Sequence, residues 1–244
     1  MHLVVNGCSH TAGAEIEYPR QGECYEKAWG AQLATRLGAT YENLAMSGAS
    51  NQRVVRTTYE WLYNYISSGK DIKDLFVICM WPGTYRTEIH FDKKYDFNFD
   101  NKWLPIIVGN DDQYRETFPR TLYNYYRAWT VFNDTVMGVT EYYNNVLNLQ
   151  NLLIRYKIKY LFINAVDIPS ATDYDFNHYH VHINKNNFLH FGDADKVYTS
   201  YCTQNNQPIS PHSISSGFNS HFADTTQVWY GDYLFDYIKE NQLL

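Results

Sequence analysis

A serine follows the first predicted strand, in a turn made of small residues. The stretch Val4–Gly13 reads VVNGCSHTAG, so Ser9 comes directly after an apolar run and lies between Gly7 and Gly13. A turn at the carboxyl end of a buried strand exposes a side chain where ligands of open α/β folds bind. The Ser9 hydroxyl would become a nucleophile there if a nearby base took its proton. The alternative is a tight loop that simply suits glycine and serine.

The other chemically active side chains indicate less. His178, His180 and His182 alternate in HYHVH, and an extended strand would place all three on one side, where they could bind a metal. No cysteine or acidic partner is obvious, so we interpret them as exposed loop histidines and expect neither metal nor cofactor. The cysteines are scattered without a CxxC pair, which predicts a reducing compartment and neither disulfides nor a zinc site. They are Cys8, Cys24, Cys79 and Cys202.

Apolar runs predict the strands that would position Ser9. His2–Gly7 and Tyr41–Ala45 are short, whereas Leu75–Trp81 (LFVICMW) and Lys159–Val166 (KYLFINAV) are continuous and apolar. Continuous runs of this kind are typical of parallel strands that are buried on both faces. Strands and helices alternate along the chain, which predicts an α/β fold with a βαβ-type sheet covered on both faces.

Helical spacing predicts what covers the sheet. The first helix is expected to end at Gly38, and the third to break near Gly138. We expect one domain over residues 1–244, with an irregular insertion near 89–119 and a long loop near 168–218 that forms part of a site or an interface. The predicted helices are Cys24–Leu37, Ser50–Ser67, Leu122–Tyr156 and Asp224–Asn241.

The composition excludes several classes of protein. A net charge of -6 disfavours a nucleic-acid binder, because phosphate contacts need clustered lysine and arginine. No apolar run reaches about 18 residues, and the N-terminus lacks the pattern of a signal peptide, so we expect no membrane span and a cytoplasmic protein. The chain contains 23 tyrosines, and a tyrosine-rich surface would suit sugars or another protein. The alternative is that tyrosine here replaces leucine or phenylalanine in the core.

Four separated blocks, taken in order, resemble the SGNH or GDSL hydrolase family. Within that family, the chain is most similar to the phage-type variant that carries GCS in place of GDS. The resemblance implies a three-layer α/β/α sandwich with a parallel, flavodoxin-like sheet, for which we expect the strand order 2-1-3-4-5. The blocks are GCSHTAG, NLAMSGASN (Asn43–Asn51), VICMWPGTYR (Val77–Arg86) and HFADTTQVWYGDYL (His221–Leu234).

The resemblance also implies roles for individual residues. Ser9 would be the nucleophile, His221 the general base, and Gly48 a donor of its backbone N–H to the oxyanion. Both Ser9 and His221 are expected at the carboxyl edge of the sheet. Asn51 would either cap a helix or contact the substrate. His10 could line the pocket, or could be the working base, although residues adjacent on a turn usually diverge.

Two positions depart from the family pattern. The third block lacks the asparagine that donates to the oxyanion, and Thr84 or Arg86 could substitute for it, although Arg86 could equally be structural. The aspartate expected three residues before His221 is replaced by Phe218. For the group that orients His221 we rank a residue of the long loop first (Asp193 or Asp195). Asn219 or a backbone carbonyl is second. Asp224 is third, because with Gln227 it has the spacing of a capping box.

We therefore predict a serine esterase that hydrolyses small acyl esters, with O-acetyl groups on a glycan as the expected substrate. The alternative is a catalytically degenerate SGNH fold that binds a glycan or a protein, for example as a viral structural component. A small acyl ester or a glycan is the expected partner, a homo-oligomer is compatible with the sequence, and nucleic acid and membrane are not expected. If the chain is phage-encoded, the virion is an alternative location.

Overall fold

The computed structural model describes residues 1–17, 22–90, 103–169, 174–216 and 220–244. A parallel sheet forms its centre, and the strand order is β2-β1-β3-β6. These four strands follow the predicted order 2-1-3-4. No fifth strand pairs with them in the described residues; Phe188 instead makes one isolated parallel bridge to Phe162. The strands are β1 (His2–Asn6), β2 (Thr40–Asn43), β3 (Leu75–Trp81) and β6 (Lys159–Asn164).

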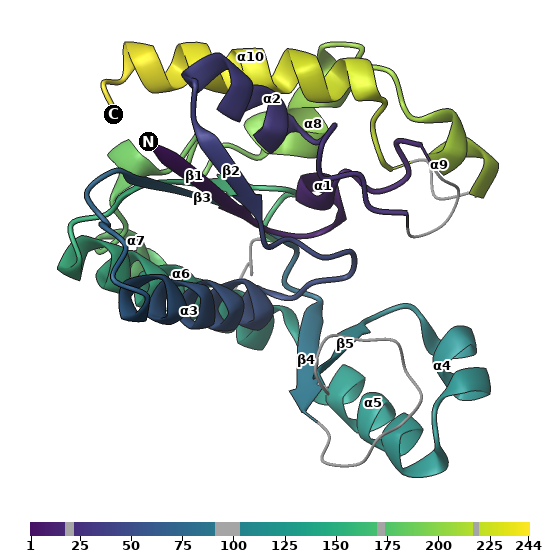
Figure 1. Cartoon of the computed structure of the whole chain (residues 1–244). Helices are drawn as coiled ribbons and strands as arrows, with labels where there is room; N and C mark the ends of the chain where they lie inside the picture. Colours follow the sequence, from purple (N-terminus) through teal and green to yellow (C-terminus); the bar gives the residue numbers. More distant parts are fainter. Residues whose placement is uncertain (18–21, 91–102, 170–173, 217–219) are drawn as a thin grey trace.

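Helices cover both faces of this sheet (Figure 1). On one face, α1 (Ser9–Ala12), α2 (Trp29–Leu37) and α10 (Asp224–Glu240) enclose a core that includes Trp29, Leu33 and Leu234. On the other face, α3 (Asn51–Ser67) and α6 (Thr135–Arg155) enclose a second core. All seven residues of β3 are buried between the two cores, which explains its continuous apolar sequence. The predicted three-layer α/β/α sandwich with a parallel sheet is confirmed.

Local signals set the ends of the helices. Gly38 ends α2 in the left-handed conformation (φ 60°), as predicted. Ser50 caps α3, because its side chain accepts a hydrogen bond from the N–H of Arg53. The predicted break near Gly138 is wrong, since Gly138 lies inside α6. The break comes earlier, between α5 (Arg120–Phe132) and α6, where Asp134 caps the new helix by accepting from Met137 N.

We predicted an irregular insertion near residues 89–119, but its described part contains regular elements. Strands β4 (Arg86–His90) and β5 (Trp103–Ile107) form an antiparallel hairpin, and α4 (Asp111–Thr117) and α5 follow it. These elements project from the sandwich (Figure 1) and share a core of their own. Five-residue strands and a seven-residue helix are too short to show a clear period in the sequence. Residues 91–102 of the predicted insertion lie outside the described residues.

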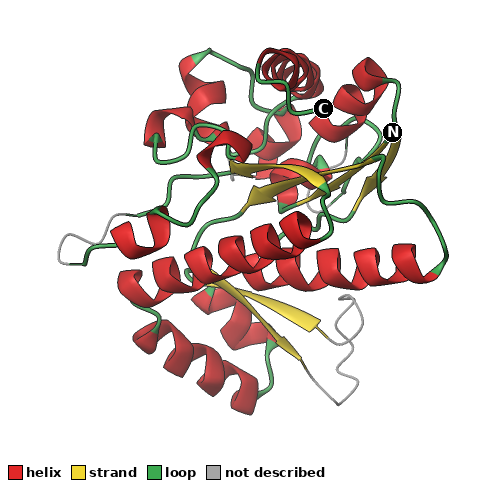
Figure 2. Ribbon diagram, turned by 90° about the vertical axis from the view of Figure 1, so that its left-hand side faces the viewer, coloured by secondary structure: helices red, strands yellow, loops and turns green. Residues whose placement is uncertain are grey.

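The segment 168–218 is also more regular than the long loop we predicted. In its described part, short helical turns follow one another; Figure 1 labels α7, α8 and α9 among them, and Figure 2 shows the molecule from the side with all helices in red. HYHVH does not form an extended strand, because its first three residues belong to a helix, and His180 Nε2 lies 2.7 Å from the Tyr143 hydroxyl. The turns are α7 (Asn177–His180), η2 (Lys185–Asn187), η3 (Ala194–Lys196), α8 (Tyr198–Gln204) and α9 (Pro211–Ser216).

Within the described parts of the chain, no helix combines the length and the apolar character that crossing a membrane requires.

Candidate active site

The turn that carries Ser9 depends on a close approach of backbone segments. Gly7 follows β1, and a Cβ at this position would come within 2.3 Å of Thr11 Oγ1 and 2.8 Å of the Met80 carbonyl oxygen. Cys8 then adopts an extended conformation and precedes α1, whose first residue is Ser9. The first N–H groups of a helix have no partner within it. The structure therefore places Ser9 at the carboxyl end of β1, 7% exposed, at the start of a helical turn.

A buried carboxylate holds His221. The Nδ1 atom of His221 lies 2.9 Å from Oε2 of Glu15, whose residue is only 2% exposed. Glu15 has a left-handed backbone (φ 61°), which is uncommon for a residue with a side chain. Its N–H donates to the Gly22 carbonyl at 3.1 Å, and its own carbonyl accepts from the Ser210 hydroxyl. Left-handed backbone of this kind persists where the surroundings fix it, and it clusters at functional sites.

Our ranking of the groups that would orient His221 was wrong. Asp193 caps η3 by accepting from Asp195 N, and its other oxygen lies 3.6 Å from Lys196 Nζ. Asp224 accepts from the N–H of Thr225 at 2.7 Å instead of reaching His221. Phe218 and Asn219 lie outside the described residues. The only signal for Glu15 was an acid six positions after Ser9.

The predicted capping box at the start of α10 is also wrong. Gln227 is buried, and its side chain joins two other helices instead of returning to the helix start. Its Oε1 accepts from Trp29 N at 3.1 Å, and its Nε2 donates to the Tyr198 hydroxyl at 3.2 Å.

The ring of His10, the second residue of α1, lies next to the ring of His221. Its ring centroid is 5.2 Å from that of His221 and 5.2 Å from that of Tyr198. Burial, and then the neighbouring His221 and Arg86, hold the pKa of His10 well below 6.5, so it is neutral at neutral pH. The Nδ1 atom of His10 is buried and has no hydrogen-bond partner among the described residues. The neutral ring therefore lines the site with one polar atom still available.

Gly48 and Asn51 lie beside this turn. Gly48 has φ 79° and lies in a turn in which Ala49 N donates a hydrogen bond to the carbonyl oxygen of Met46. Met46 N in turn donates to the carbonyl oxygen of Gly7 at 3.3 Å. The turn is thereby tied to the residues that precede Ser9. Because Ser50 caps α3, the side chain of Asn51 is not needed as a cap. Asn51 is 3% exposed, and its Oδ1 has no hydrogen-bond partner in the part of the chain that the structure describes.

Arg86 bonds to the Gly48–Ala49 turn, whereas Thr84 lies against α6. Nη1 of Arg86 donates to the Ala49 carbonyl at 3.4 Å, and its Nε is buried and bonds to none of the described residues. Burial opposes the charge, but Cys8 and Tyr85 outweigh it and raise the pKa of Arg86 above its ordinary value. No carboxylate among the described residues pairs with it. Thr84 instead faces α6, with Oγ1 3.5 Å from the position a Cβ would take on Gly138.

We call these five side chains the Ser9 cluster: Ser9, His10, Asn51, Arg86 and His221. Three of its members carry buried polar atoms without partners, which most native structures avoid. In the described residues the Ser9 hydroxyl makes no hydrogen bond to the His221 ring. Such bonds are often long before substrate binds. The arrangement therefore offers a hydroxyl, an oriented imidazole and a cation that a ligand could satisfy.

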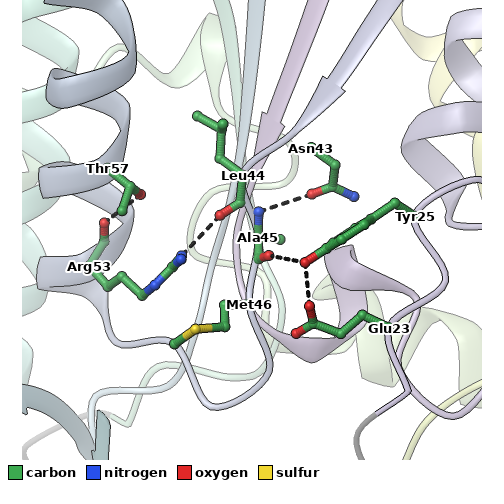
Figure 3. A pocket seen from close by; sticks show the side chains of 8 residues that line it. All are labelled: Glu23, Tyr25, Asn43, Leu44, Ala45, Met46, Arg53 and Thr57. Atoms are coloured by element: carbon green, nitrogen blue, oxygen red, sulfur yellow. Dashed lines mark hydrogen bonds between the residues drawn. The ribbon is translucent and has the colours of Figure 1, made fainter. Parts of the chain in front are cut away.

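A pocket of about 380 Å³ is lined by the end of β2, the segment that follows it, part of α3 and two residues that precede α2 (Figure 3). Two of its polar side chains, Asn43 and Glu23, bond to neighbouring groups. Asn43 donates to Thr11 O and to the Tyr41 hydroxyl, both at 2.8 Å, and accepts from Ala45 N. Glu23 accepts from Ser47 N at 2.6 Å and from the Tyr25 hydroxyl. We call this the closed pocket, since its bonds hold the segment after β2 in place. Its lining residues are Glu23, Tyr25, Asn43, Leu44, Ala45, Met46, Arg53 and Thr57.

Metal ligands do not gather in the described part of the chain, where no group of three or more His, Cys, Asp or Glu side chains could hold an ion.

Comparison with known proteins gives a family and several similar structures. The model of a family of unknown function (DUF6071) matches residues 15–181, a range that contains Glu15, Gly48 and Arg86 and leaves out Ser9 and His221. No curated protein sequence matches the chain.

Solved esterase structures are similar at low identity. An acetyl xylan esterase, AlAXEase, is 16% identical, with a TM-score of 0.44 over 97% of this chain and 98% of its own. The esterase EstA from Pseudoalteromonas sp. is 13% identical, with a TM-score of 0.42 over 98% of this chain and 97% of its own. A carbohydrate acetylesterase family member from Sinorhizobium meliloti is 11% identical, with a TM-score of 0.46 over 100% of both chains. At these identities and TM-scores, none of the similarities establishes a shared activity.

Proposed function

We propose that this chain, which belongs to the family of unknown function DUF6071, is a serine ester hydrolase of the SGNH type. The observation that supports the proposal most is the buried hydrogen bond of 2.9 Å between Glu15 and His221. A carboxylate on Nδ1 fixes the tautomer in which Nε2 is free to accept a proton. A histidine held in this way beside a serine turn has the arrangement of a nucleophile, a base and a group that orients the base.

The reaction then proceeds in two steps. The Ser9 hydroxyl gives its proton to His221 Nε2 as Oγ bonds to the ester carbonyl carbon. When the tetrahedral intermediate collapses, the bond to the alcohol oxygen breaks, and His221 returns the proton to that oxygen. Water repeats the sequence on the acyl-enzyme and releases the acid and free Ser9. Glu15 keeps its charge throughout and stabilises the imidazolium that forms in each step.

The negative charge on the carbonyl oxygen needs donors that are already in place. The backbone N–H of Gly48 and the first N–H groups of α1 are the backbone candidates. Arg86 takes the role of the asparagine that the third block lacks, because it reaches the Gly48–Ala49 turn and has an unpartnered Nε. Thr84 is disfavoured for this role because it faces α6. Asn51 and His10 contribute polar atoms that contact the substrate.

A small acyl ester fits this site best. Ser9 and His10 are each only 7% exposed, so little room surrounds the reacting oxygen. The substrate class that we propose is the O-acetyl group of a glycan, whose sugar part remains outside the buried site. The exposed tyrosines Tyr63, Tyr85 and Tyr125 show that part of the tyrosine content is at the surface.

Hydrolysis of p-nitrophenyl acetate tests the proposal. Ser9→Ala is expected to lower kcat/KM by at least about 10³-fold, because the nucleophile is lost. The matched control is Ser68→Ala, an exposed serine at the end of α3, which should retain the activity of the wild type. Circular dichroism confirms that both variants are folded. Equal rates for wild type and Ser9→Ala would exclude Ser9 from the reaction and leave the alternative, a degenerate fold that binds glycan or protein.

A further inference from the structure

The β4–β5 hairpin presents one of its two faces to the site. Along β5, Leu104 and Ile106 point into the core of the insertion, where they are 3% and 0% exposed. The alternate residues point the other way, as the period of a strand requires. Ile107 Cδ1 lies 3.5 Å, and Pro105 3.9 Å, from the position a Cβ would take on Gly48. The hairpin therefore lies against the turn that we propose to bind the oxyanion.

Arg86 is on the same face as Ile107. The two residues are direct partners across the hairpin, so their side chains lie side by side. Arg86 reaches the Ala49 carbonyl while Ile107 packs on Gly48, and the Gly48–Ala49 turn is thus covered by a cation and an aliphatic side chain together. A carbonyl oxygen bound at this turn would place one of its two substituents against Ile107.

The position of this face is fixed by several bonds. Glu88 forms two hydrogen bonds of 2.9 Å with Arg56 on α3, and the Glu88 side chain is 4% exposed. The Arg56 guanidinium also lies over the Trp103 ring, 4.4 Å from its centroid. The N–H of Ile107 donates to the Tyr114 hydroxyl at 3.0 Å. A wall held by a bidentate ion pair and a backbone hydrogen bond does not yield readily to a longer substrate.

We infer that the β4–β5 hairpin limits the length of the acyl group, with Ile107 as the residue that determines specificity. The inference rests on the proposed function, and it states which part of the substrate lies against Ile107 and which part faces solvent. The alcohol part of a glycan ester is large and must stay open to solvent. The closed side at Ile107 is therefore the acyl side, and it accommodates an acetyl group better than a butyryl or hexanoyl group.

A chain-length series tests this inference. The kcat/KM values for p-nitrophenyl acetate, butyrate and hexanoate are measured for the wild type, Ile107→Ala and Val108→Ala. The wild type is expected to prefer acetate. Ile107→Ala should raise the ratio of butyrate to acetate by about tenfold, the lower end of what a methylene contributes to discrimination. Val108→Ala, the next residue and 38% exposed, is the control and should leave the ratio unchanged.

The outcomes separate the two proposals. Activity on all three esters with the same preference in the wild type and in Ile107→Ala would overturn the role of Ile107 and leave the esterase intact. A second variant, Ile107→Trp, fills the same space and should lower the rate with butyrate more than the rate with acetate; equal losses would also overturn the inference. Wild-type protein without activity on any ester would overturn the proposed function, and this inference with it.

Discussion

The Ser9 cluster and the closed pocket differ in the hydrogen bonds that their polar atoms make. In the closed pocket, Asn43 uses its amide for three hydrogen bonds, and Glu23 accepts from Ser47 and Tyr25. In the Ser9 cluster, His10 Nδ1, Asn51 Oδ1 and Arg86 Nε are buried without partners in the described part of the chain. We therefore interpret the closed pocket as a structural region and propose the Ser9 cluster as the functional one.

The cost of unpaired atoms explains why this difference is informative. A buried polar atom without a partner costs about 1–3 kcal/mol of stability. Among the described residues, the Ser9 cluster contains three such atoms. A substrate that bonded to them would recover that cost when it bound. By the same reasoning, substitutions in the Ser9 cluster should change activity, and substitutions in the closed pocket should change stability.

Among the substitutions that test this comparison, the largest loss of activity is expected at Glu15. Glu15→Gln removes the charge that stabilises the imidazolium of His221, and kcat for p-nitrophenyl acetate should fall by about 10²- to 10⁴-fold with little change in KM. Asp224→Asn is the matched control, since Asp224 bonds only to the start of α10, and it should stay within about twofold of the wild type. If the two variants lost activity equally, Glu15 would have no special role.

A smaller loss is expected when the cation of the cluster is removed. Arg86→Met keeps much of the side-chain volume but cannot donate to an oxyanion, and kcat/KM should fall by about 10²-fold. Arg86→Lys should recover part of the rate, because it restores the charge without the geometry of the guanidinium. A full rate in Arg86→Met would show that the backbone donors suffice and that Arg86 is structural.

The closed pocket should respond in the opposite way. Glu23→Gln weakens the bonds to Ser47 N and the Tyr25 hydroxyl, and urea unfolding should show a loss of about 1–3 kcal/mol in the free energy of unfolding. At a temperature where the variant is folded, its kcat/KM should stay within about fivefold of the wild type. A large loss of activity with unchanged stability would move the closed pocket into the active site.

The smallest effect concerns the dependence of stability on pH. His10 has a pKa well below 6.5 in the folded protein, so below about pH 6.5 the unfolded chain binds a proton that the folded chain does not. The His10 contribution is complete above that pH and is lost as the pH falls, at up to about 1.4 kcal/mol per pH unit. His10→Gln should reduce the slope of stability between pH 7 and pH 5, measured by urea unfolding. The exposed His178→Gln should keep the full slope.

The sequence predicted the elements whose burial is simple. Strand β3 was predicted with its observed bounds, because burial on both faces leaves a continuous apolar run. Helix α3 was predicted to within one residue, because Ser50 gives a clear start. The hairpin was missed, since β4 and β5 have five residues each and acquire their core only from α4 and α5.

The site could be predicted only in part, and for a similar reason. The turns of Ser9 and Gly48 are local, and small residues mark them in the sequence. Glu15 meets His221 across 206 positions, and its side chain reaches the ring from a left-handed backbone that no sequence pattern specifies. The residues that we ranked for this role, Asp193, Asp195, Asn219 and Asp224, all lie in the last quarter of the sequence, whereas the carboxylate comes from the other end of the chain.

Labelling with a fluorophosphonate probe tests the central claim most directly, because the probe reacts with a serine only when a base and an oxyanion site activate it. Intact-mass and peptide mass spectrometry should show one adduct, located on Ser9, in folded wild-type protein. The adduct should be absent from Ser9→Ala, slower by about 10²-fold in Glu15→Gln and unchanged in Glu23→Gln. Folded wild-type protein that remains unlabelled, or an equal adduct on Ser9→Ala, would contradict the assignment of the Ser9 cluster as an active site.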